Sequence, residues 1–82
     1  MTPMISISAA QIRAARGLLG WSGPNLAKTS GVSLATIRRM ESAGPERSSQ
    51  VNLEAIRRAF DNAGVIFTSA DAGGGPGVRL KA

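Results

Sequence analysis

The sequence predicts a mainly α-helical domain of four helices followed by a short β-hairpin. Two observations carry this prediction. Between residues 8 and 63, apolar residues recur at the three- and four-residue intervals of amphipathic helices. After residue 64, short β-branched and apolar runs flank a glycine-rich segment, which is typical of two strands joined by a turn. The chain has 82 residues, enough for one domain.

The first helix is expected from Ser8 to Gly20. Ser8 and Gln11 have the spacing of a capping box, and Gly20 suits a helix C-terminus. Residues 1–7 precede this helix as a short, loosely ordered arm. The apolar stripe of the helix is formed by Ile12, Ala15 and Leu19, with Leu18 beside them.

A short second helix and a third helix are expected on either side of Gly31. Ser22 is a good N-cap for the second helix, and Pro24 is tolerated in its first turn. Gly31 supplies the positive φ of a tight turn, and Ser33 caps a third helix that runs from residue 34 to about residue 43. The result is a helix-turn-helix over about residues 23–43.

The third helix has two different faces. Ile37 and Met40 are expected to point into the core together with Val32. The opposite face is formed by residues one helical turn apart, which are Leu34, Ala35, Arg38 and Arg39.

A fourth helix and a hairpin complete the predicted fold. Residues 44–50 are expected to form a loop. The fourth helix is expected from about Asn52, its cap, to Ala63. Its inward face is formed by Leu53, Ile56, Phe60 and Ala63, and Arg57 and Arg58 lie on the outer side. Residues 65–82 form the hairpin. An isolated hairpin is marginal in water, so it needs the helical core or a second chain. We expect it to dimerise the protein through Val65, Phe67, Val78 and Leu80.

Composition favours a polyanionic partner and disfavours catalysis. Ten Lys and Arg residues against five Asp and Glu give a net charge of +5. His and Cys are absent, and the five carboxylates form no evident pair, so we expect no metal site, no cofactor, no small-molecule ligand and no enzyme activity. No apolar run is long enough to span a membrane and no secretory signal is evident, so a cytoplasmic protein is expected.

A set of sixteen residues follows a characteristic order and spacing: Arg16, Gly20, Trp21, Ser22, Leu26, Ala27, Gly31, Val32, Ser33, Thr36, Ile37, Arg39, Glu41, Gly44, Leu53 and Ile56. In these residues the chain resembles the phage-repressor-like helix-turn-helix family, also called the XRE or Cro type. The resemblance covers about residues 9–64, and the hairpin is similar to that of some small bacterial members. It implies a four-helix, lambda-repressor-like DNA-binding domain over residues 8–64.

This resemblance assigns roles to individual residues. It places base contacts at Leu34, Ala35, Arg38 and Arg39, with Arg39 as the best candidate for a bidentate contact to guanine. It places phosphate contacts at Ser22, Gly23, Asn25, Ser33, Thr36, Arg47 and Ser48. It also implies a structural ion pair between Arg16 and Glu41. The family commonly has Gln where this chain has Gly23, so the side chain that braces the reading helix is missing here.

The function expected from this reading is a sequence-specific transcriptional regulator. It would bind a two-fold symmetric operator in double-stranded DNA as a homodimer. Two alternatives stay open: an architectural or recombination factor of a mobile element, and an antitoxin or anti-activator whose strands add to a partner's sheet. The interaction module does not need the Arg38 and Arg39 face, so neutralising both residues discriminates it from the DNA-binding readings.

Overall fold

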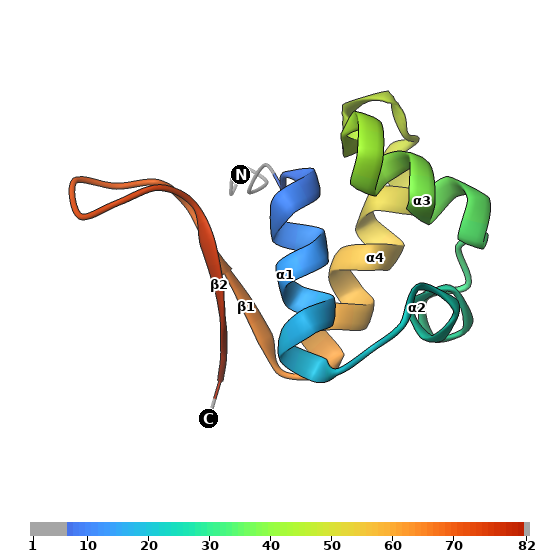
Figure 1. The fold of residues 1–82 in the computed structure, drawn as a ribbon, viewed down its shortest axis with the longest axis horizontal. Coiled ribbons are helices and arrows are strands. Elements are labelled where there is room, and N and C mark those ends of the chain that lie inside the picture. Colours follow the sequence, from blue (N-terminus) through green and yellow to red (C-terminus); the bar gives the residue numbers. More distant parts are fainter. Residues whose placement is uncertain (1–6, 82) are drawn as a thin grey trace.

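Within residues 7–81, the part of the chain that the computed structural model describes, four α-helices are followed by a two-stranded antiparallel hairpin (Figure 1). This confirms the expected mainly helical architecture with a terminal hairpin. The elements are α1 (Ala9–Leu19), α2 (Gly23–Ser30), α3 (Leu34–Ala43), the short 3-10 helix η1 (Pro45–Arg47), α4 (Gln50–Asn62), β1 (Val65–Thr68) and β2 (Gly77–Leu80).

Each α-helix begins after a serine that caps it. The hydroxyl oxygens of Ser8, Ser22, Ser33 and Ser49 each accept a hydrogen bond from the backbone N–H three residues later. The expected cap of the fourth helix was wrong: Asn52 donates its backbone N–H to Ser49, so α4 begins at residue 50. The preceding loop is correspondingly shorter and contains η1.

The core lies where α1, α2, α3 and α4 meet and extends to the first residue of β1. Its buried apolar residues are Ile7, Ile12, Ala15, Leu26, Val32, Ile37, Met40, Ile56, Ala59, Phe60 and Val65. Phe60 is the largest fully buried side chain, and its ring lies 5.8 Å from the ring of Trp21 and 5.7 Å from the ring of Phe67 between centroids. Trp21 therefore packs on the core between α1 and α2.

Burial differs from the sequence prediction at several positions. Ile7, assigned to the arm, is buried in the core, while residues 1–6 lie outside the described part of the chain. Leu18 is exposed, because it lies about 100° around the helix from Leu19 and the described residues do not cover that side of α1. Leu53 and Ala63 are only half-buried.

The hairpin packs its inner face against α1 and α4. Residue 65 pairs with residue 80 and residue 67 with residue 78, while the loop between the strands projects beyond the helical body (Figure 1). The side-chain amide of Gln11 in α1 donates hydrogen bonds to the backbone oxygens of Thr68 and Gly77, at 3.2 and 3.0 Å. One glutamine therefore fastens both strands to the start of α1. No helix of the described residues is long and apolar enough to cross a lipid bilayer.

Candidate nucleic-acid interface

A tight turn sets α3 at a fixed angle to α2. Gly31 ends α2 with a φ of 77°, and its N–H donates to the Ala27 oxygen at 2.9 Å. The Val32 N–H donates to the Ser30 hydroxyl at 3.1 Å, and the Val32 side chain is buried under the turn. Ser33 then caps α3. The turn is thus held by hydrogen bonds on both sides and by a buried side chain in its centre.

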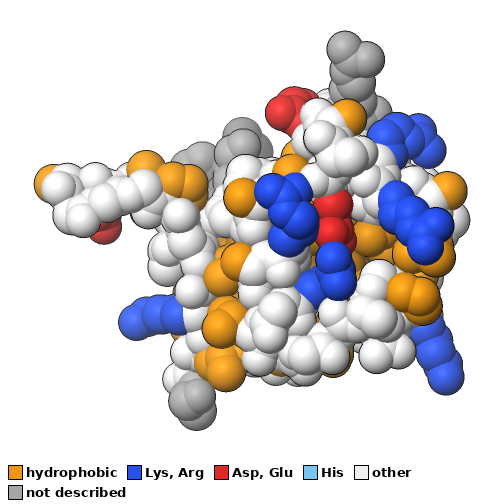
Figure 2. Space-filling view, viewed as in Figure 1, with side chains coloured by type: hydrophobic (Ala, Val, Ile, Leu, Met, Phe, Trp, Pro, Cys, Tyr) orange, Lys and Arg blue, Asp and Glu red, His pale blue; other side chains and the backbone are white. Residues whose placement is uncertain are grey.

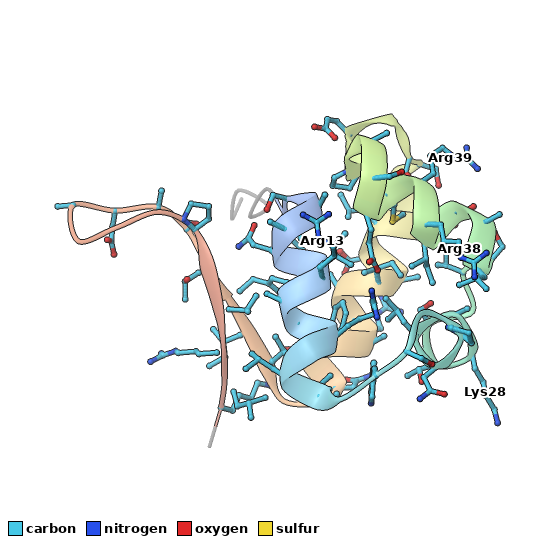
Figure 3. All side chains as sticks on the ribbon, viewed as in Figure 1. Arg13, Lys28, Arg38 and Arg39 are labelled. Carbon is cyan, nitrogen blue, oxygen red and sulfur yellow. The ribbon has the colours of Figure 1, made fainter. Side chains whose placement is uncertain are left out.

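The two faces of α3 differ in burial and charge. Ile37 and Met40 are buried, at 1% and 0% exposure, whereas Ala35, Arg38 and Arg39 are exposed. Arg38 and Arg39 project from the outer side of the helix, away from α1 and α4 (Figure 3). Within residues 7–81, neither guanidinium has a hydrogen bond or an ion pair. Ten guanidinium donors are therefore presented to solvent along one side of α3.

Leu34 differs in burial from the other three residues expected to contact bases. It is half-buried, because it packs toward α2 at the point where that helix begins. A Cβ atom placed on Gly23 would lie only 3.1 Å from the Leu34 Cδ1 atom. The first residues of α2 and α3 are therefore in close contact, and the outward face of α3 is formed by residues 35, 38 and 39.

The ion pair implied by the resemblance is present between α1 and α3. The Arg16 Nε and Nη2 donate to the two carboxylate oxygens of Glu41 at 2.8 and 2.7 Å, and Nη1 donates to the Trp21 oxygen at 3.1 Å. The hydrogen bond to Glu41 raises the pKa of Arg16, partly offset by burial and reinforced by the charge of Glu41. Arg13 also donates to the backbone oxygen of Glu41. Two arginines of α1 thus hold the last turn of α3.

The residues expected to contact phosphate fall into two groups. Ser22, Gly23, Asn25, Ser33 and Thr36 lie at the starts of α2 and α3, which the structure brings together. Ser22 and Asn25 are exposed there, and the Ser33 hydroxyl donates to that of Thr36 at 2.9 Å. Ser48 is half-buried between η1 and α4, beyond the opposite end of α3, and the side chain of Arg47 lies outside the described part of the structure.

The hairpin residues expected to dimerise the chain mostly face its own core. Val65 is buried, at 1% exposure, and Phe67 and Val78 pack against the same cluster. Leu80 is the exposed member of the set, at 42%. Side-chain contact with a second chain through Val65 is therefore excluded in this arrangement, because the helical core already covers it.

The basic residues of α4 differ from those of the other helices in the carboxylate that lies beside them. On one face of the molecule, Lys and Arg side chains lie over α1, α2 and α3 (Figure 2). On α4, by contrast, Glu54 accepts hydrogen bonds from Arg57 and lies 4.0 Å from Arg58. The hydrogen bond from Arg57 lowers the pKa of the Glu54 carboxyl, so the carboxylate stays charged and offsets these arginines.

Two residues of this arrangement were not anticipated as contacts. Gln11 completes the expected capping box and also holds the hairpin, and Arg13 donates to the backbone of α3. Both contacts join segments far apart in sequence, so no local pattern could have indicated them. In comparisons with known proteins, no protein-family model matches the chain and no curated protein is significantly similar to it.

Proposed function

We propose that this protein is a sequence-specific DNA-binding transcriptional regulator of the phage-repressor-like type, which inserts α3 into the major groove. The observation that carries the proposal is the exposed side of α3. Arg38 and Arg39 point outward without partners in the described structure, while Ile37 and Met40 anchor the helix from below. Arginine is the residue best suited to bind guanine edges with two hydrogen bonds, and the net charge of +5 favours DNA.

The orientation of α2 fits the same role. With α3 in the groove, α2 would cross the DNA backbone and offer a phosphate the Gly23 backbone N–H together with the exposed side chains of Ser22 and Asn25. Pro24 has no N–H, and the N–H of Asn25 already donates to the Ser22 hydroxyl. These contacts would fix the position of α3 along the groove without reading sequence.

The test begins with selection of a preferred sequence from a random duplex library. Binding of the selected and random duplexes is then measured by fluorescence anisotropy across a salt series. We expect the wild type to prefer the selected duplex by about 1000-fold or more. Arg39→Ala should reduce that preference about 10- to 100-fold with little change in salt slope, because a base contact is lost.

Arg58→Ala is the matched control. Arg58 is also exposed but lies on α4, outside both α3 and the hairpin strand that the dimer would use. The control removes the same charge and should leave the sequence preference unchanged. Binding without any sequence preference would overturn the regulator in favour of an architectural DNA-binding factor. An Arg39→Ala variant that binds like Arg58→Ala would overturn reading by α3.

The proposal includes a homodimer on two half-sites one helical turn apart. A single small module buries only about 600–1000 Å² on DNA, so two copies are needed for tight, selective binding. The exposed Leu80 and the strand β2 that carries it are the part of the hairpin available to a second chain. Analytical ultracentrifugation tests this: a monomer both at high protein concentration and on operator DNA would overturn the dimer.

A further inference from the structure

We propose that Leu34 is a positioning residue, which sets the orientation of α3 by packing against the side-chain-free Gly23, and that base reading falls to Ala35, Arg38 and Arg39. This inference rests on the proposed function, because it concerns how α3 is held when it lies in the groove. It removes Leu34 from the expected base contacts and gives Gly23 a specific role.

The contact itself explains why residue 23 is a glycine. Its backbone does not require one, because the described glycines with positive φ are at positions 20, 31, 44 and 64. Space does: a Cβ at this position would approach Leu34 Cδ1 to 3.1 Å, closer than the 3.4–4 Å of ordinary van der Waals contact. A Cβ added at residue 23 therefore forces the Leu34 side chain to shift by a few tenths of an ångström at the point where α3 begins.

The neighbouring residue shows the contrast. Ala35 follows Leu34 directly and is exposed, whereas Leu34 is half-buried. A leucine whose side chain is turned toward α2 presents less of its surface to a base pair than Ala35 does. A contact with a thymine methyl group, if one is made from this turn, is accordingly assigned to Ala35.

The opposite end of α3 is held independently. Glu41, seven residues after Leu34, is bound by Arg16 and Arg13 of α1. The two attachments are separated by about 10 Å along the helix axis, and Arg38 and Arg39 lie between them. A shift at the Leu34 end therefore tilts α3 about the Glu41 end and moves both guanidinium groups. Bidentate base contacts tolerate displacements of only about 0.5 Å, so sequence preference is sensitive to this tilt.

The first experiment compares two glycine-to-alanine variants on the selected duplex. Gly23→Ala should lower the preference for the selected over the random duplex about tenfold, equivalent to about 1.4 kcal/mol. Gly17→Ala is the matched control, because Gly17 is also helical, is exposed and has no atom within 4 Å of an added Cβ. It should change the preference less than about twofold, which is about 0.4 kcal/mol.

A double variant with Gly23→Ala and Leu34→Ala tests whether the two residues act through the same contact. Leu34→Ala should also lose about tenfold, and the double variant should lose about tenfold as well, since the Cβ added at residue 23 then has no Leu34 side chain to displace. Independent effects would instead multiply to about a hundredfold loss. Thermal unfolding of every variant separates lost stability from lost preference, and Leu34→Val provides a milder change should Leu34→Ala not fold.

The second experiment distinguishes positioning from base reading. Each thymine of the selected duplex is replaced in turn by uracil, which lacks the methyl group, and binding of the wild type and Leu34→Val is compared. If Leu34 only positions α3, uracil substitutions affect both proteins in the same pattern. Leu34→Val then binds every duplex more weakly than the wild type by the same factor. A uracil effect seen in the wild type and absent in Leu34→Val would show a Leu34–methyl contact and overturn the inference.

The outcomes also separate this inference from the proposed function. A wild type that selects no sequence overturns both. A wild type that selects a sequence, with Gly23→Ala indistinguishable from Gly17→Ala, leaves DNA reading intact and overturns only the positioning role of Leu34.

Discussion

Replacing Glu41 with glutamine should destabilise the protein far more than the same change at Glu54. Both variants raise the net charge from +5 to +6 and remove a carboxylate that binds arginine. Glu41 joins α1 to α3 through two hydrogen bonds of 2.7 and 2.8 Å, and its side chain is only 11% exposed. Glu54 pairs with arginines of its own helix and is 33% exposed.

The magnitude follows from this geometry. Hydrogen bonds to charged groups contribute about 1.5–3 kcal/mol, and breaking a fully buried ion pair costs about 3–5 kcal/mol. Arg16 keeps 25% of its side chain exposed, and glutamine retains one acceptor oxygen, so water and the amide compensate in part. We expect Glu41→Gln to lower the free energy of unfolding by about 2 kcal/mol, which in a domain of this size lowers the Tm by about 8–16 °C.

Urea denaturation followed by Trp21 fluorescence, together with thermal unfolding, measures both variants. Trp21 is a suitable reporter because its backbone oxygen accepts a hydrogen bond from Arg16 and its ring stacks on Phe60. Equal destabilisation by the two substitutions would refute the reasoning. It would mean that an ion pair between two helices contributes no more to stability than an ion pair within one helix.

Three further predictions concern the backbone, the hairpin and acid stability. Gly31→Ala should destabilise the protein by about 1 kcal/mol in urea denaturation, because φ is 77° at that position, whereas Gly17→Ala in the exposed part of α1 should stabilise it by about 0.5–1 kcal/mol. Gln11→Ala should accelerate amide hydrogen exchange in the hairpin before it affects α3, because both strands lose their hydrogen bonds to α1. The lowered pKa of Glu54 means that its contribution is present at neutral pH and is lost as the pH falls through its folded-state pKa, so Glu54→Gln should show a smaller acid dependence of stability.

The helical part of the fold was predictable because its signals are local. Ser8, Ser22 and Ser33 each satisfy a backbone N–H three residues away, so the cap and the group that it caps lie within one turn of sequence. Gly31 acts through its own φ angle. The prediction failed at the start of α4 because two polar residues, Ser49 and Asn52, are both good caps, and local preference did not decide between them.

Local sequence patterns did not predict the contacts between distant segments. Whether Leu18 or Leu80 is covered depends on which elements pack beside α1 and β2, and both prove to be exposed. In the candidate site, too, the features that were predictable are the local ones. The alternation of exposed arginines and buried apolar residues along α3 follows from helical periodicity, which the sequence contains.

The sequence by itself determined the helices, their caps, the tight turn and the basic face of α3, because each depends on residues no more than one or two helical turns apart. Only the tertiary structure decided that Leu34 turns toward Gly23 and that Gln11 fastens the hairpin. These depend on how separate elements meet: the hydrogen bonds of Gln11 join residues 57 and 66 positions apart. Such pairings follow from the packing of the whole chain, in which each side chain takes the space that its neighbours leave.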